Sequence, residues 1–266
     1  MNALRSLAFN VLFFSGTAVM LLLMWVLLPF PYTAIQRTVT LWGQAIRWLL
    51  RTIVGLGFEV RGRENVPDGP AVFACKHQSA WDIVIFYAIT HDPTYVLKKE
   101  LMRIPFWGWY ATKVRVIVVD RKGGGGALKG LVRAARATLA AGRPVVIFPE
   151  GTRTAPDERR AYQPGVYAIY AEGAAPVVPV AVNSGLFWGR RSFVKRPGVI
   201  TLEILPPMPP GLDRRAFMAE LENHIESATA RLVAEARRRF PWLPKAATPD
   251  ARGERVSAPP SAPTSP

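Results

Sequence analysis

A run of 24 residues without a charged side chain near the amino terminus restricts most strongly what this chain can fold into. The run is Leu7–Phe30, LAFNVLFFSGTAVMLLLMWVLLPF. As a helix it would reach roughly 36 Å at about 1.5 Å per residue, which is enough to cross the hydrocarbon core of a bilayer. A cleaved signal peptide is the competing interpretation, but the run is too long for its apolar region and no A-x-A site follows. We therefore expect a retained membrane segment.

The charges that flank this run predict its orientation. Arg5 is the only charged residue before it, whereas Arg37, Arg47 and Arg51 follow it closely. Basic residues concentrate on the cytoplasmic side of membrane segments. We expect a protein of the cell inner membrane whose catalytic domain faces the cytoplasm.

A second segment, residues 34–58, carries apolar side chains at helical spacing with arginines between them. This pattern is typical of a helix that lies in the membrane interface. An amphipathic helix packed on the soluble domain is the alternative, and the two are compatible if each face does one job. We interpret residues 1–56 as a membrane-anchoring helical segment, either spanning the bilayer or lying in one leaflet.

Composition limits the class of the remaining chain. The 266 residues are 50% hydrophobic, enough for one large α/β domain, and 34 Lys and Arg against 19 Asp and Glu give a net charge of +15. Such a surface attracts anions. Together with the apolar run, this charge favours an anionic membrane over nucleic acid as partner. The single cysteine, Cys75, excludes an intramolecular disulfide, and three histidines indicate no metal cluster.

Short apolar runs alternate with helical patterns from residue 57 onward. This alternation predicts an α/β domain over residues 57–240, with a mixed, largely parallel sheet covered by helices. Residues 241–266 are rich in Pro, Ala and Ser and predict a disordered tail. The expected strands are 58–61, 71–75, 94–97, 114–119, 145–148, 177–182 and 199–205. The expected helices are 80–89, 127–141, 165–172 and 213–239.

The stretch KHQSAWD places a histidine and an aspartate five positions apart, His77 and Asp82. Within one helix these side chains would diverge by about 140°, so contact requires a bend between them. Ser79 predicts that bend, since S-x-x-D starts a helix and places the aspartate in its first turn. A carboxylate on one ring nitrogen would leave the other nitrogen as a general base. The alternative is a structural histidine beside a capped helix.

The stretch VVIFPEGTRT predicts a strand that breaks into a turn carrying Glu150, Gly151 and Arg153. Ligands bind at the carboxyl ends of parallel strands. Glycine lets a backbone approach a ligand closely, and arginine presents a planar fork that matches phosphate. An ordinary turn with a surface ion pair remains the alternative.

In this order, KHQSAWD and FPEGTR resemble the two main motifs of the 1-acylglycerol-3-phosphate acyltransferase family. The blocks VIVVDR and VVPVAVNSG resemble two further motifs, and residues 95–109 resemble the linking segment. The second block departs from the family pattern, since the glycine usual ahead of its strand is replaced around Val114 and Arg115. The resemblance covers roughly residues 58–210.

The resemblance implies roles for individual residues. His77 resembles the general base and Asp82 its orienting partner. Further residues resemble those that bind the acceptor's glycerol phosphate, namely Arg121, Glu150, Gly151 and Arg153, with Lys98 as an additional candidate. No cofactor is implied, because acyl carrier protein or coenzyme A delivers the acyl group as a thioester co-substrate. The implied reaction acylates the 2-hydroxyl of a 1-acylglycerol phosphate and makes phosphatidic acid for phospholipid biosynthesis.

Several alternatives stay open from sequence. The acceptor could be another lysolipid, such as a lyso-ornithine lipid or a lysophospholipid, and a protein of another class could tether membranes or bind lipid without catalysis. Cys75 could carry an acyl-enzyme intermediate, although it ends a buried strand. The glycines at 123–126 lack the ending of a nucleotide-binding loop, and we interpret them as a flexible turn.

Overall fold

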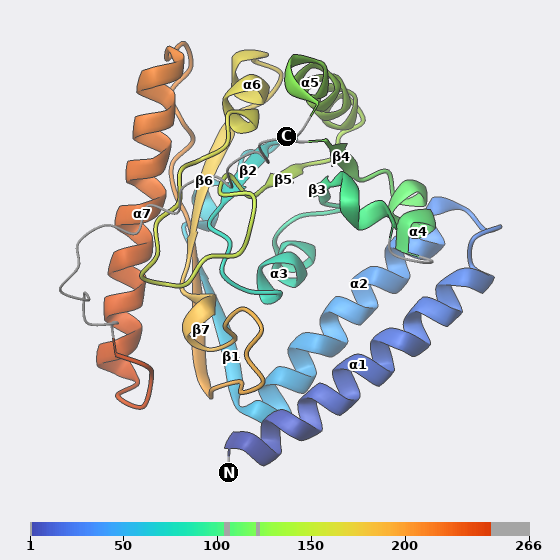
Figure 1. The fold of residues 1–266 in the computed structure, drawn as a ribbon, viewed down its shortest axis with the longest axis vertical. Helices are drawn as coiled ribbons and strands as arrows, with labels where there is room; N and C mark the ends of the chain where they lie inside the picture. The colour runs from blue at the N-terminus through green and yellow to red at the C-terminus, as the bar shows by residue number, and fades with distance from the viewer. Residues whose placement is uncertain (1, 104–106, 121–122, 246–266) are drawn as a thin grey trace, which may run out of the picture.

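The computed structural model describes residues 2–103, 107–120 and 123–245, and its centre is a seven-stranded sheet (Figure 1). The strand order is β1-β7-β6-β2-β5-β3-β4. Neighbouring strands run parallel except β6 and β7, which run antiparallel. The predicted mixed, largely parallel sheet is therefore confirmed. The strands are β1 Leu56–Arg61, β2 Val72–Cys75, β3 Thr94–Lys98, β4 Ile117–Val119, β5 Val145–Ile147, β6 Val177–Val182 and β7 Gly198–Ile204.

Seven α-helices surround this sheet within the described ranges. They are α1 Asn2–Val26, α2 Tyr32–Leu49, α3 Trp81–Ile89, α4 Trp107–Lys113, α5 Gly124–Ala140, α6 Gly165–Ala171 and α7 Arg214–Arg239. Helix α2 continues as a π-helical turn, η1 (Leu50–Val54), and ends at Gly55 in the left-handed conformation. Three short 3-10 segments also occur among the described residues, namely η2 Arg63–Asn65, η3 Lys99–Arg103 and η4 Ser184–Leu186.

Two elements correct the sequence prediction. The glycines at 124–126 form the first turn of α5 rather than a flexible turn. The expected strand 114–119 shortens to β4, because Arg115 adopts a left-handed φ of 56° and ends the preceding helix. Glycine adopts this conformation without strain, so the backbone accounts for the glycine that is usual near this position.

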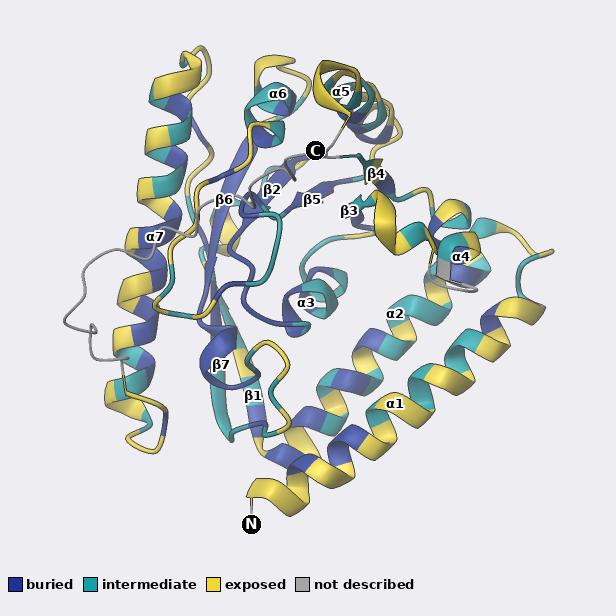
Figure 2. Ribbon diagram, in the orientation of Figure 1, coloured by how far each residue is buried: buried dark blue, intermediate teal, exposed yellow. Residues whose placement is uncertain are grey.

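The strands place alternate side chains on opposite faces of the sheet, and helices cover both faces. Phe73 and Cys75 of β2 pack in a core with α1, η1 and α3. Val72 and Ala74 pack on the other face with α5, α6 and the amino-terminal half of α7. Figure 2 shows the central strands buried between these layers. The chain thus forms a three-layer α/β/α arrangement.

The amino-terminal helices share this core. Phe9 of α1 and Leu50 of η1 are buried in the same cluster as Trp81 of α3. The opposite side of α1 is exposed, with Phe14 at 67% and Leu22 at 68% (Figure 2). By length and composition, α1 could cross a membrane, and no other described helix meets that test. The helical segment is therefore packed on the α/β domain while one apolar face stays uncovered.

The predicted disordered tail falls largely on residues 246–266, which lie outside the described residues. The chain is described as far as Lys245. Leu243 is buried against the core, so the first residues after α7 still belong to the packed domain.

Candidate active site

The loop between β2 and α3 creates the bend that the sequence predicts, although the capping differs in detail. Helix α3 begins at Trp81, and its backbone N–H donates to Ser79 Oγ at 3.1 Å. Asp82, in the first turn, accepts from the backbone N–H groups of Gln78 at 2.7 Å and Ser79 at 2.8 Å. The carboxylate thus satisfies donors of the loop that would otherwise lack partners.

This bend brings His77 and Asp82 into contact. His77 Nδ1 lies 2.9 Å from Asp82 Oδ2, and Asp82 is fully buried. Ser184 Oγ donates to the other carboxylate oxygen at 2.5 Å. The imidazole also stacks on Phe148, with ring centres 3.9 Å apart. With Nδ1 occupied, the ring is oriented so that Nε2 remains to exchange a proton with a ligand.

The loop after β5 holds the main chain of His77. Glu150 Oε2 accepts from the His77 backbone N–H at 2.9 Å, and the Thr154 N–H donates to the His77 carbonyl at 2.8 Å. Gly151 turns this loop with a φ of 68°, a conformation that strains other residues. The two sequence motifs therefore meet through backbone hydrogen bonds as well as through the cavity.

The side chain of Glu150 points into the protein interior rather than toward the acceptor side of the turn. Its side chain is fully buried, and its Oε1 atom contacts Lys76 Nζ at 2.7 Å and Thr154 Oγ1 at 2.6 Å. Burial raises the pKa of the Glu150 carboxyl, and the Lys76 ammonium opposes that rise. Glu150 does not line the adjoining cavity. Glu150 thus faces away from the cavity, whereas the resemblance implies that it binds the acceptor.

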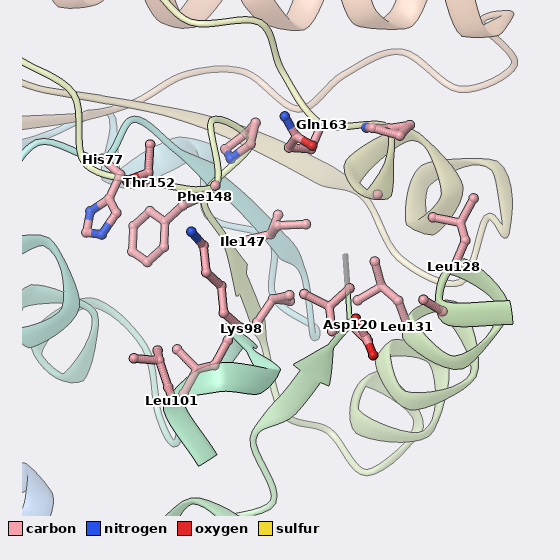
Figure 3. Close-up of a pocket in the computed structure, with 18 of the residues that line it drawn as sticks. His77, Lys98, Leu101, Asp120, Leu128, Leu131, Ile147, Phe148, Thr152 and Gln163 are labelled. Atoms are coloured by element: carbon pink, nitrogen blue, oxygen red, sulfur yellow. The ribbon is translucent and has the colours of Figure 1, made fainter. Parts of the chain in front are cut away.

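A cavity of about 640 Å³ opens beside His77. Figure 3 shows His77 and Phe148 at one end, with the Lys98 ammonium pointing toward them, and Leu128 and Leu131 at the other end. The apolar lining comes from α3, β3, η3, β4, α5 and β5 and includes Ile83, Val96, Leu97, Leu101, Val119 and Ile147. The cavity therefore offers a proton-accepting end and a long apolar wall.

Basic side chains predominate among the charged groups of the lining. Three residues that the sequence analysis proposed as acceptor ligands, Lys98, Gly151 and Arg153, line the cavity. Arg190 and Arg191 also line it, and the sequence analysis did not single them out. The three arginines form no ion pair with any described residue. Unneutralised cations around one cavity attract an anionic ligand.

The remaining predicted positions divide in two. Arg121 lies outside the described residues. Cys75 is buried within β2, and burial raises the pKa of its thiol well above the ordinary value. A thiol in this state is a poor nucleophile, so the cysteine is not suited to carry an acyl group.

Sequence reasoning missed Ser184, Arg190 and Arg191 for one reason. All three follow β6 in sequence: Ser184 begins η4, and Arg190 and Arg191 line the cavity. Arg190 also donates to the Arg153 carbonyl at 3.2 Å. Ser184 stands inside the block VVPVAVNSG, which marked this region without assigning the hydroxyl a partner. No spacing in the sequence connects the arginine pair to the earlier motifs.

Comparison with known proteins shows which family the chain belongs to. The Acyltransferase family matches residues 57–183. A 1-acyl-sn-glycerol-3-phosphate acyltransferase of Pseudomonas aeruginosa is 33% identical over 236 residues, covering 88% of this chain and 92% of the relative. A lyso-ornithine lipid O-acyltransferase of the same organism is 27% identical over 214 residues, covering 74% and 80%.

A solved structure shares the fold. The crystal structure of the 1-acyl-sn-glycerophosphate acyltransferase of Thermotoga maritima superposes with a TM-score of 0.70 at 20% identity, covering 88% of this chain and 98% of the other. The relative from Pseudomonas aeruginosa is similar over nearly its whole length. The chain is therefore an O-acyltransferase that belongs to the 1-acyl-sn-glycerol-3-phosphate acyltransferase family.

Proposed function

We propose that this protein transfers a fatty acyl group from a thioester to the 2-hydroxyl of 1-acylglycerol-3-phosphate and releases phosphatidic acid. The observation that carries the proposal is the His77–Asp82 pair at 2.9 Å, which opens onto a cavity with cationic and apolar walls. A phosphorylated lipid with an acyl chain matches both kinds of wall. The similarity to the acyltransferase of Pseudomonas aeruginosa supports the same substrate class.

The chemistry requires a base because an alcohol is a weak nucleophile at neutral pH. Nε2 of His77 takes the hydroxyl proton as the oxygen attacks the thioester carbonyl carbon. Asp82 stabilises the imidazolium that forms, because its buried carboxylate bonds the opposite nitrogen. The carbon–sulfur bond then breaks, and the imidazolium returns the proton to the leaving sulfur, so the products are an ester and a free thiol.

The acceptor's phosphate is assigned to the cationic part of the cavity. Arg153 presents two parallel N–H groups that match two phosphate oxygens, and Gly151 leaves room for their approach. Lys98 adds a positive charge from β3, and Arg121 is proposed as a further ligand from the second block. This assignment predicts a preference for phosphorylated over neutral acceptors.

The location of the lipid substrate suggests the location of the enzyme. We infer that the uncovered face of α1 enters the bilayer and that the net charge of +15 draws the protein to anionic lipid. The inner membrane, with the cavity on the cytoplasmic side, follows from the flanking arginines. Acyl carrier protein or coenzyme A would deliver the donor from that side.

The deciding experiment pairs both donors with several acceptors. Purified enzyme is assayed with acyl carrier protein and coenzyme A thioesters against 1-acylglycerol-3-phosphate, monoacylglycerol and lyso-ornithine lipid. We expect fastest transfer to the phosphorylated acceptor, and Arg153→Ala should raise its KM by about 10- to 150-fold, with Arg153→Lys intermediate. An unchanged phosphate preference in Arg153→Ala would place the phosphate elsewhere.

A second candidate acceptor is a lyso-ornithine lipid, since a relative of that name is similar over 74% of the chain. Faster transfer to that acceptor would favour it. A noncatalytic lipid-binding role would instead be indicated if His77→Ala retained full biological activity.

A further inference from the structure

A buried lysine that the proposed reaction does not use lies directly beside His77. Lys76 Nζ contacts Glu150 Oε1 at 2.7 Å and Glu226 Oε1 at 2.7 Å, and the Lys76 side chain is 0% exposed. Tyr162 donates its hydroxyl to Glu226 at 2.9 Å. We call Lys76, Glu150, Thr154, Tyr162 and Glu226 the Lys76 cluster. Its members come from the loop after β2, from the loop after β5 and from α7.

The charges of the Lys76 cluster need an explanation beyond stability. One ammonium faces two carboxylates, and the hydroxyls of Thr154 and Tyr162 supply further donors. Taking three ions out of water is costly, and replacing a buried ion pair by apolar side chains is often neutral or stabilising. A cluster of this kind is therefore weak support for the fold alone, and its geometry points to a different use.

The Lys76 cluster reaches the active site through one carboxylate. Glu150 uses Oε1 for Lys76 and Thr154 and uses Oε2 for the backbone N–H of His77. The carbonyl of His77 receives the Thr154 N–H at 2.8 Å. Both backbone polar groups of His77 are thus held by the same loop, and the ammonium of Lys76 holds that loop's carboxylate.

We propose that Lys76 and Glu150 are positioning residues of the acyltransferase site, which together fix the main chain of His77, and that Glu226 ties this arrangement to α7. The proposal rests on the proposed role of His77 as general base. It replaces the expectation that Glu150 binds the acceptor. It also gives a use to Lys76, to which the sequence assigned none.

The ionised form of Glu150 is essential to this arrangement. Three donors meet its two oxygens, from Lys76, Thr154 and the His77 backbone. A carboxylate accepts all of them. A protonated acid or an amide carries a hydrogen of its own, which would point at one of these three donors and replace an attraction by a repulsion. Displacement of a catalytic group by about 1 Å can lower the rate about 100-fold.

The sharpest test compares two isosteric variants that each remove one negative charge from Lys76. Glu150→Gln disturbs the contact to His77, whereas Glu226→Gln keeps an oxygen for Lys76 and Tyr162 and does not touch His77. We expect Glu150→Gln to lower kcat about 10- to 100-fold with the acceptor KM within about threefold, and Glu226→Gln to lower kcat less than about threefold. Thermal unfolding of both variants gives the matched measure of structural damage.

A pH profile of Lys76→Met provides a second readout. Burial raises the pKa of Glu150 and the Lys76 ammonium opposes that rise, so removing the ammonium favours the protonated acid. We expect kcat of this variant to recover toward the wild-type value as the pH rises, with its rising limb displaced to higher pH.

The comparison of the Lys76→Met pH profile with that of the wild type isolates Glu150, because the other charged groups around His77 are the same in these two proteins. Asp82 contacts the imidazole from α3, and the charged residues that line the same cavity are Lys98, Asp120, Arg153, Arg190 and Arg191. Glu226 is the other carboxylate that contacts Lys76, and the Glu226→Gln variant reports its share. Lys76 Nζ also donates to the Glu158 carbonyl at 3.2 Å, and the Lys76 charge contributes to lowering the pKa of the Glu158 carboxyl.

Three results would overturn the proposal. A rise of about tenfold in the acceptor KM of Glu150→Gln, with kcat unchanged, would mean that Glu150 binds the acceptor. Equal losses of kcat in the two glutamine variants, in proportion to their melting temperatures, would mean a purely structural cluster. A Lys76→Met profile parallel to wild type would remove the link to Glu150, and if that variant fails to fold, the glutamine pair decides.

The proposed function fails by a different result, because it requires wild-type transfer and its loss in His77→Ala. The variants of the Lys76 cluster are measured with whichever lysolipid the wild-type enzyme acylates fastest. A wrong acceptor assignment therefore leaves the test of positioning intact.

Discussion

Asp82→Asn removes one negative charge beside His77 while keeping the shape of the side chain. In the wild type, Oδ2 accepts from His77 Nδ1 and from the backbone N–H groups of Gln78 and Ser79, and Oδ1 accepts from Ser184. The amide oxygen of asparagine can take the three-donor position. Its amino group then faces the Ser184 hydroxyl, which can rotate to accept. The loop therefore has no reason to rearrange.

The expected loss of rate follows from the lost charge. Neutral asparagine cannot stabilise the imidazolium that forms when His77 takes a proton, although it can still hold the ring. A positioned general base contributes about 10²- to 10⁴-fold, or about 2.7 to 5.4 kcal/mol of transition-state stabilisation. We expect kcat of Asp82→Asn to decrease by a factor within this range, about 10² to 10⁴. The free energy of unfolding should fall by only about 1–3 kcal/mol, because charge-assisted hydrogen bonds are replaced by neutral ones.

Ser184→Ala is the matched control, since it removes one donor to Asp82 and leaves the charge and three donors in place. The lost hydrogen bond ends on a charged carboxylate, so the free energy of unfolding should fall by about 1.5–3 kcal/mol. The value of kcat should fall by less than about 100-fold, the lower limit expected for Asp82→Asn, because Asp82 keeps its charge and its contact with His77. The assay measures the free thiol released from the acyl donor at saturating acceptor, in mixed micelles, with thermal unfolding measured alongside. If Asp82→Asn loses no more activity than Ser184→Ala, the carboxylate does not act through its charge, and the assignment of His77 as base is refuted.

Three further predictions test other parts of the structure. Phe14→Lys with Leu22→Lys should weaken co-sedimentation with anionic vesicles without lowering Tm, because these side chains are 67% and 68% exposed; unchanged binding would assign the membrane contact to another surface. Cys75→Ala should keep kcat within about threefold, because burial raises the pKa of its thiol, and a folded but inactive variant would indicate a covalent intermediate. Burial lowers the pKa of Lys195 from 10.5 to about 8. The contribution of Lys195 to the free energy of unfolding is therefore greatest above pH 10.5, where the side chain is neutral in both states, and it is lost as the pH falls through about 8. The free energy of unfolding of Lys195→Met relative to wild type should therefore decline from pH 8 to 10.5, and a constant difference would contradict the buried ammonium.

The elements were predictable where hydrophobic pattern and turn residues agree. Strand β6 has the predicted bounds, Val177–Val182, because a short, fully buried apolar run between Pro176 and Asn183 fits a central strand. Strand β4 is shorter than predicted, because the left-handed φ of Arg115 depends on the path of the preceding helix α4. That short helix has no apolar period long enough to be recognised in the sequence.

The local pattern alone predicted a contact within the site only where the two partners are close in sequence. His77 and Asp82 are five residues apart, and a capping pattern supplied the bend between them. Ser184 lies 102 residues from Asp82, and Glu226 lies 150 residues from Lys76. Such contacts are set by which strands and helices lie side by side in the sheet, and a local pattern does not carry that information.

The orientation of Glu150 shows how electrostatics decides between two readings of one motif. A carboxylate aimed into a cavity for a phosphorylated lipid would repel the ligand and weaken the cations beside it. The left-handed turn at Gly151 instead lets Glu150 face inward to Lys76 while Arg153 faces the cavity. One motif thus separates its charges, because Glu150 accepts from the His77 backbone N–H and does not line the cavity, whereas Arg153 lines it. Exchanging these two directions would place an anion beside the phosphate and a guanidinium beside the buried ammonium, and both contacts would be repulsive.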